Sequence, residues 1–206
     1  MTQMDSTIVN VSLPSIRDAL HSNLASAQWI ISGYLLALAL ILPLNGWIVD
    51  RVGPKKLYLW CFGAFTLTSL LCGISTTMDQ LICARLLQGM AGGLLAPLTQ
   101  MMMARAAGNQ MARAIGYAAT PVLLAPTVGP IVAGAILKYL NWSWLFYVNL
   151  PIGVAAIALA SYLLPKDDSI TARRSFDGVG FLLISPGLAL LLYGLERASH
   201  HAGVIP

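Results

Sequence analysis

The chain has 206 residues, of which 57% are hydrophobic and 10% are charged, and its formal net charge is +4. A soluble domain carries about 25% charged residues, and a disordered chain combines low hydrophobicity with high charge, so this composition excludes both classes. An integral membrane protein of several helices is the class that fits. The positive charge does not indicate nucleic-acid binding, because basic residues run at most two together and no aromatic residues lie between them.

In chain order, the first predicted helix is Met1–Leu20, the weakest of seven apolar stretches. Its apolar core covers only Thr7–Ile16, and Asp5 and Asn10 lie within or beside it. We interpret this stretch as a helix that begins upstream, so that its first two turns are missing from this chain.

The other six stretches are long enough, at about 20 residues, to cross the hydrocarbon core of a bilayer. The sequence therefore predicts an all-α, polytopic membrane helix bundle. We expect an amino-terminal six-helix domain at 1–164, an internal charged linker at 165–176, and a further helix with an external tail at 177–206. The six stretches lie near Ala27–Val49, Leu57–Ser75, Gln80–Ala104, Ala114–Leu137, Trp144–Leu164 and Val179–Leu195.

Lysine and arginine indicate the internal loops, since cytoplasmic loops carry an excess of both. If the first helix runs outward, the loops after the second, fourth and sixth helices are internal. They hold Arg51, Lys55, Lys56, Arg105, Arg113, Lys166, Arg173 and Arg174, whereas the external segments hold Arg17, Lys138 and Arg197. This bias supports the alternation of sides but does not by itself establish the first crossing.

Asp5 and Arg85 are charged residues expected at membrane depth. A lone charge there costs about 2.5–3.5 kcal/mol on insertion scales, so such residues face a water-filled cavity or a partner. From the helical rise, Asp5 would lie roughly 15 Å and Arg85 roughly 10 Å below the external surface, a gap that a long arginine side chain can bridge.

The functional interpretation of this pair is a carboxyl group that exchanges protons. Burial favours the neutral form of Asp5 and a nearby Arg85 favours the charged form, so a substrate cation could compete with the proton. Two structural alternatives stay open. Asp5 could be an interfacial residue at a frayed helix end, and Arg85 could bind backbone carbonyls.

The turn after the second helix reads Gly46-Trp-Ile-Val-Asp50-Arg51-Val-Gly53-Pro54-Lys55-Lys56. Gly46 would permit close helix contact, and Gly53 with Pro54 predicts a tight turn. Asp50 could bind the positive amino terminus of a neighbouring helix. An ordinary positive-inside loop explains the charges alone but not the whole pattern.

Two later helices carry closely spaced small residues and prolines. In Gln80–Ala104, Gly89 and Gly93 form a GxxxG pair that lets helices approach, and Gln88 lies on the same side as Arg85. Prolines free backbone groups and bend a helix, so we interpret Ala114–Leu137 as a gating helix along a substrate path, with plain helix packing as the alternative. Its residues of this kind are Pro121, Pro126, Gly129, Pro130 and Gly134.

Three residues are candidates to line a substrate cavity: Asn10, Trp29 and Tyr34. Membrane anchoring explains the two aromatic residues equally well. No metal site is predicted, because the three cysteines lack ligand spacing. Cys61, Cys72 and Cys83 are instead expected to be small buried hydrophobic residues.

Six segments are each similar to a motif of one family. They are Asp5–Pro14, Gly46–Lys56, Arg85–Gly93, Gly129–Gly134, Asn141–Gly153 and Phe176–Gly180. Together they resemble the major facilitator superfamily, and within it the fourteen-helix drug:proton antiporters of the EmrB/QacA type. One departure is Ala133, which stands where a glycine is common.

This resemblance implies the roles of several residues. Asp5 and Arg85 would take part in proton coupling, Asp50 and Arg51 would help to latch the inward gate, and Gly129–Pro130 would bend its helix between the two halves of a transporter. It also implies lipophilic, often cationic, substrates, and a proton gradient as energy source without a cofactor. The expected partners are the lipid bilayer and a missing carboxy-terminal half, with a periplasmic adaptor as a further candidate, in a bacterial inner membrane.

Two functions stay open from the sequence. The first is a proton-coupled multidrug efflux transporter of which this chain is the front part, unable to transport alone because the path lies between two halves. The alternative is a non-transporting membrane remnant, or a subunit that must assemble with a second half. A soluble enzyme is remote, since the sequence has no nucleophile–base pair, phosphate-binding loop or metal-ligand cluster.

Overall fold

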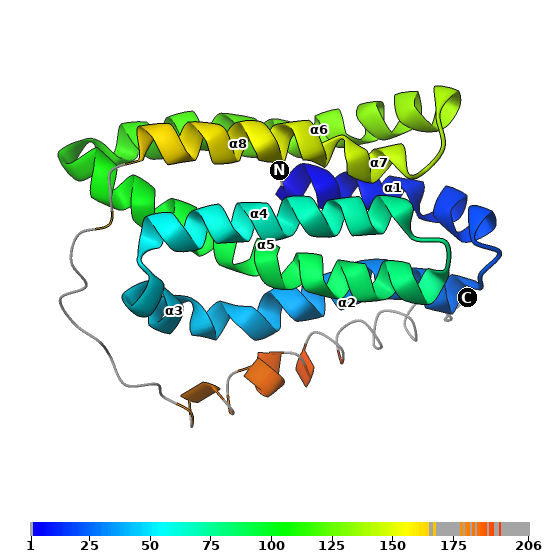
Figure 1. Ribbon diagram of the computed structural model, residues 1–206, viewed down its shortest axis with the longest axis horizontal. Coiled ribbons are helices and arrows are strands. Elements are labelled where there is room, and N and C mark those ends of the chain that lie inside the picture. Colours follow the sequence, from blue (N-terminus) through cyan, green and yellow to red (C-terminus); the bar gives the residue numbers. More distant parts are fainter. Residues whose placement is uncertain are drawn as a thin grey trace, which may run out of the picture.

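The computed structural model describes residues 2–164, 167, and positions 178, 180, 181, 183, 185–188, 190, 191 and 194, apart from the side chains of 106, 109 and 111. Every regular element in these residues is helical, which confirms the predicted all-α bundle (Figure 1). The helices are α1 (Thr2–Ala19), α2 (Leu24–Ile41), α3 (Asn45–Val52), α4 (Pro54–Ile74), α5 (Met78–Ala107), α6 (Met111–Tyr139), α7 (Trp144–Tyr147) and α8 (Asn149–Leu163). The linker predicted at 165–176 lies outside the described residues except for Asp167.

Five segments of the described chain are long and apolar enough to cross a membrane. They are Leu24–Val52, Pro54–Ile74, Met78–Arg105, Ala112–Tyr139 and Trp144–Leu163. Although α1 is not among them, it is a helix within the bundle, and Asp5, Ile8 and Ile16 on it are fully buried. Packing against the neighbouring helices therefore supports a segment whose own hydropathy is too low.

Two predicted spans each contain a short break in the regular α-helix, although each remains one membrane-length segment. The span at Ala27–Val49 breaks at the 3₁₀ turn Leu42–Leu44, where Pro43 has no backbone N–H to donate. The span at Trp144–Leu164 is divided between α7 and α8, with Val148 between them. By contrast, α6 remains a single helix of 29 residues in spite of its three prolines.

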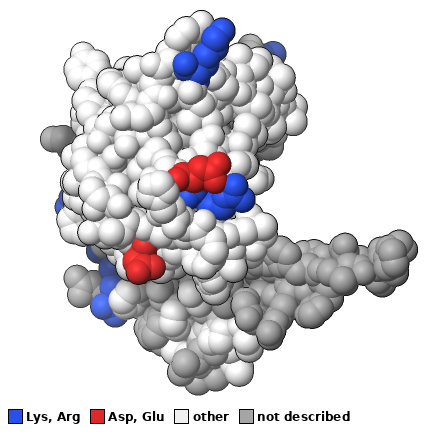
Figure 2. All heavy atoms as spheres, turned by 90° about the vertical axis from the view of Figure 1, so that its right-hand side faces the viewer, with Lys and Arg blue, Asp and Glu red and all other residues white. Residues whose placement is uncertain are grey.

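The loops alternate between the two ends of the bundle, as the charge bias predicted. The α1–α2, α4–α5 and α6–α7 connections lie at one end, and the α3–α4 and α5–α6 connections lie at the other (Figure 1). We call these the external and internal ends. Figure 2 looks onto the external end and shows few charged side chains on it. Arg17 and Asp18, in the last turn of α1, pair with each other at 2.7 Å.

The buried side chains form two apolar clusters along the bundle. One includes Ile8, Leu81 and Phe146, and the other includes Tyr34 and Phe65. On both α4 and α5, the buried polar residues lie in the sequence between residues of one cluster and residues of the other. They therefore lie where the two clusters meet. Of the three cysteines expected in the core, Cys61 and Cys72 are buried; that expectation is wrong for Cys83, which lies on an exposed face of α5.

Candidate functional site

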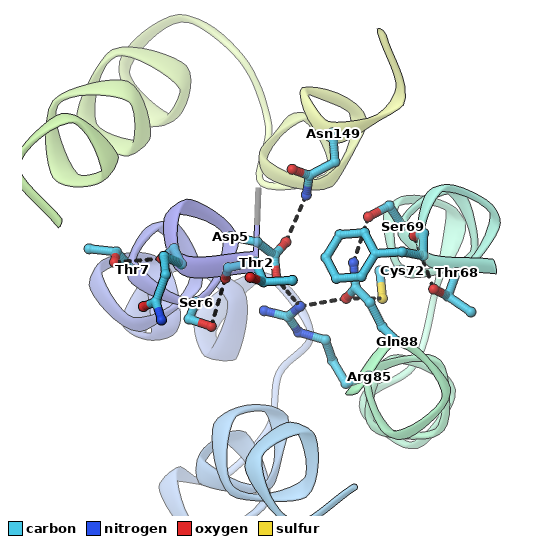
Figure 3. Close-up of polar contacts among 12 residues, drawn as sticks. Thr2, Asp5, Ser6, Thr7, Thr68, Ser69, Cys72, Arg85, Gln88 and Asn149 are labelled. Carbon is cyan, nitrogen blue, oxygen red and sulfur yellow. Dashed lines mark hydrogen bonds and ion pairs between the residues drawn. The ribbon is translucent and has the colours of Figure 1, made fainter. Parts of the chain in front are cut away.

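The two charged residues predicted at membrane depth form a buried ion pair. Nη1 of Arg85 on α5 donates to Oδ2 of Asp5 on α1 at 2.6 Å (Figure 3). The side chains are 2% and 0% exposed, respectively. This contact excludes the interfacial alternative for Asp5, and it gives Arg85 a carboxylate partner rather than backbone carbonyls.

Asn149 forms a hydrogen bond with the second oxygen of the Asp5 carboxylate. Its Nδ2 donates to Oδ1 of Asp5 at 2.7 Å, and the residue is 1% exposed. Sequence reasoning missed this role. An available signal was an amide in a long apolar stretch, which is costly at membrane depth without a partner. Both carboxylate oxygens therefore accept a charge-assisted hydrogen bond, the stronger kind.

Gln88 extends the network from α5 to α4. Its Oε1 accepts a hydrogen bond from Nη1 of Arg85, and its Nε2 donates to Oγ of Ser69 at 2.6 Å. This confirms that Gln88 and Arg85 share one side of their helix. We call the connected set of Asn149, Asp5, Arg85, Gln88 and Ser69 the polar network; it joins α8, α1, α5 and α4 (Figure 3).

Two aromatic rings flank the Arg85 guanidinium. Its Cζ lies 5.1 Å from the ring centroid of Tyr34 and 5.1 Å from that of Phe146. Cation–π attraction of this kind strengthens when the groups are desolvated. Tyr34, one of the candidate cavity residues, is thus buried against Arg85, whereas the other two, Trp29 and Asn10, are exposed.

A buried ion pair is weak evidence for stability, because desolvation of two charges can exceed their mutual attraction. Its location is more informative. Ionisable residues inside a membrane protein are rare and mark ion pathways and proton relays. The polar network thus brings together one carboxylate, one guanidinium and two side-chain amides in the buried part of the bundle.

The glycines of α5 are sites of close helix contact. A Cβ added at Gly89 would overlap the backbone carbonyl of Tyr34 on α2, and one at Gly93 would lie 2.8 Å from the carbonyl of Leu38. This confirms the predicted GxxxG packing. The contact also places Tyr34 beside the helix turn that carries Arg85.

The segment Pro126–Gly134 of α6, which contains prolines and glycines, is only partly buried. A Cβ at Gly129 would lie 3.0 Å from Cβ of Thr7 on α1, so this glycine brings α6 against the helix of Asp5. Pro130 is half-buried, whereas Pro126 and Gly134 are exposed. The predicted bending role of this segment stays a prediction.

We call the turn Gly46–Lys56 the gate motif. Gly46 is exposed on α3, and a Cβ there would meet no atom within 4 Å, so the expected close helix contact at Gly46 is not seen among the described residues. Arg51 packs over the Trp47 ring at 4.3 Å, and Asp50 is half-buried.

Gly53 and Lys55 connect the gate motif to the chain after α8. The Asp167 carboxylate accepts hydrogen bonds from the backbone N–H groups of Lys55 at 2.8 Å and Lys56 at 3.2 Å. In return, Nζ of Lys55 donates to the carbonyls of Ser161, at 2.9 Å, and Leu164. We call these four bonds the loop clamp. The clamp pairs backbone N–H groups at the start of α4 and backbone carbonyls at the end of α8, which a helix terminus leaves unpaired.

The loop clamp also explains why glycine stands at position 53. Gly53 has φ +90°, and a Cβ there would lie 2.5 Å from Oδ2 of Asp167. Because Gly53 is the N-cap of α4 and has no side chain, Asp167 supplies the capping carboxylate from elsewhere in the chain. Sequence reasoning placed Lys55 in the gate motif but not its contact with α8.

Replacing Asp167 by alanine should expose the first amides of α4. We expect their hydrogen exchange to accelerate about tenfold or more, consistent with loss of a hydrogen bond to a charged group. The free energy of unfolding should fall by about 0.5–2 kcal/mol, the range for a lost N-cap. Exchange mass spectrometry of a peptide covering 54–58 measures the first effect. Lys56→Ala, which keeps its backbone donor, is the control and should leave that exchange rate unchanged.

Comparison with known proteins gives consistent matches. The sequence model of the Major Facilitator Superfamily matches residues 1–196. The chain is 39% identical over 199 residues to a multidrug resistance protein B homolog of Mycobacterium tuberculosis, covering 96% of this chain and 37% of that relative. It is 37% identical over 198 residues to the multidrug export protein EmrB of Escherichia coli, covering 96% of this chain and 39% of that relative. The chain therefore spans about two fifths of the length of these relatives.

Proposed function

The chain belongs to the major facilitator superfamily, and on that premise we propose that it is the front part of a proton-coupled multidrug efflux transporter. The five candidate spans among its described residues agree with a multi-pass integral membrane protein in contact with lipid. The proposed location is a bacterial inner membrane, and the proposed substrates are lipophilic, often cationic, compounds. A transporter of this kind is not an enzyme; it uses the proton gradient and needs no cofactor.

The observation that carries this proposal is the fully buried Asp5 carboxylate in the polar network. A carboxylate whose partners come from α5 and α8 links proton binding to the arrangement of several helices. When Asp5 takes up a proton, its attraction to Arg85 weakens, and the helices that carry the two residues are freed to shift. A substrate cation that approaches the same carboxylate would compete with the proton.

The proposed transport path lies between this chain and a second half of the transporter. In this fold, one half rocks against the other around a site near the middle of the membrane. The exposed surface of α6 supports such a partner. In its most apolar stretch of 18 residues, only 11% of the residues are buried, against 61% in the corresponding stretch of α5. The second half, and a periplasmic adaptor, are proposed partners of the full-length protein.

Replacement of Asp5 by asparagine tests the proposal. In the full-length transporter, we expect Asp5→Asn to abolish drug-dependent proton release from everted vesicles, because asparagine keeps the shape of the side chain but cannot exchange a proton. Asp18→Asn, the same substitution at an exposed carboxylate, should leave proton release at the wild-type level. Unchanged coupling in Asp5→Asn would rule out this role for Asp5.

A further inference from the structure

We propose that Asn149 is a positioning residue that binds Asp5 in both of its protonation states and transmits the change to α8. The inference rests on the proposed function, since it assumes that Asp5 exchanges protons. It adds a specific partner for that exchange, at the first residue of α8.

Hydrogen-bonding capacity distinguishes Asn149 from Arg85. An ionised carboxylate only accepts hydrogen bonds, and a guanidinium only donates them, so Arg85 cannot accept the hydrogen that Asp5 gains when it is protonated. A side-chain amide both donates and accepts. In the structure, Nδ2 of Asn149 donates to Oδ1 of Asp5 at 2.7 Å, the arrangement suited to the carboxylate.

Protonation of Asp5 at Oδ1 changes this atom from a hydrogen-bond acceptor into a hydrogen-bond donor. One proton from water adds to the carboxylate and forms an O–H group that needs an acceptor. A half-turn of the Asn149 amide about its terminal torsion presents Oδ1 of Asn149 to that hydrogen. When the proton leaves to water, the amide turns back, so the step is balanced and needs no other reactant.

The backbone on either side of Asn149 is packed closely against α4. A Cβ added at Gly73 of α4 would overlap the ring of Tyr147, and one at Gly153 would overlap the side chain of Thr66. These close contacts on either side of Asn149 hold α7 and α8 against α4. Asn149 is also the first residue of α8, directly after the interruption at Val148.

The groups around Asp5 come from several helices. Arg85 on α5 is the charged group in contact with it, while Tyr34 on α2 and Cys72 on α4 are the titratable groups near enough to interact electrostatically. Among the described residues, Asn149 is the neutral side chain that donates a hydrogen bond to Asp5. A change of charge at Asp5 therefore reaches α8 through this amide.

Infrared difference spectroscopy of the full-length transporter tests the inference. The C=O band of protonated Asp5 is identified by its loss in Asp5→Asn. We expect Asn149→Leu to shift this band to higher frequency, because the acid loses its acceptor. Drug-dependent proton release should fall by about tenfold or more, as expected for loss of a hydrogen bond to a charged group.

Matched variants separate this role from a structural one. Asn149→Gln keeps an amide and should keep the band closer to its wild-type position, which preserves the test even if Asn149→Leu does not fold. Asn141→Leu, the same substitution at an exposed asparagine, should change neither readout. The inference is overturned if the Asp5 band keeps its frequency in folded Asn149→Leu, or if Asn149→Gln shifts it as far as leucine does. Absence of any Asp5 band in the wild type would instead overturn the proposed function.

Discussion

Arg85→Met is expected to abolish drug-dependent proton exchange and to lower the free energy of unfolding by about 3–5 kcal/mol, the usual cost of breaking a buried ion pair by removing one partner. The substitution leaves Asp5 at 0% exposure without its cation. It also removes the donor to Gln88 and the group packed between the Tyr34 and Phe146 rings. Denaturant unfolding of the purified transporter in detergent measures the stability.

A double variant separates stability from function at this site. Asp5→Asn combined with Arg85→Met removes both charges, so it should regain most of the stability lost in Arg85→Met, because no uncompensated charge stays buried. It should still show no proton coupling, since the carboxyl group of Asp5 is gone. Additive effects of the two substitutions on stability would contradict the buried pair.

The surface ion pair offers a matched control for Arg85. Arg17 and Asp18 are 36% and 68% exposed and pair at 2.7 Å, close to the distance of the buried pair. Surface pairs contribute about 0–1 kcal/mol, because water and salt screen them. Arg17→Met should therefore change stability by no more than this and leave proton coupling intact.

Gly89→Ala is expected to force α2 and α5 apart and to destabilise the protein by about 1–3 kcal/mol, the typical cost of overpacking. An added methyl group would overlap the carbonyl of Tyr34, a backbone atom that cannot rotate away, and would lie 3.0 Å from Cβ of Ala37. Separation of the helices would also move the Tyr34 ring from Arg85, so we expect proton coupling to weaken as well.

Gly63→Ala is the matched control for this prediction. It makes the same substitution inside α4, where a new Cβ meets no described atom within 4 Å. Alanine is favoured over glycine in a helix by about 1 kcal/mol, so Gly63→Ala should be neutral or stabilising. Thermal unfolding of the two variants decides the matter: equal midpoints would show that the close approach at Gly89 is not limiting.

The amino-acid sequence alone predicted the helical spans of the described chain and the alternation of their loops. Both depend on properties that act locally: an apolar stretch of sufficient length crosses the hydrocarbon core, and lysine and arginine accumulate on one side. It also predicted that Gln88 and Arg85 share one side of a helix, since three residues span nearly one helical turn. The interruptions at Leu42–Leu44 and Val148 were missed because the average hydropathy of a span does not depend on its backbone path.

Only the tertiary structure decided which buried groups touch. Asn149 and Asp5 are 144 residues apart, and Asp167 and Lys55 are 112 residues apart, so no local period relates them. The sequence indicated that Asp5 and Arg85 each needed a partner, because an isolated charge is costly in hydrocarbon. Which side chains meet that need depends on the relative rotation and depth of packed helices, and these are determined by close contacts such as Gly89 against Tyr34.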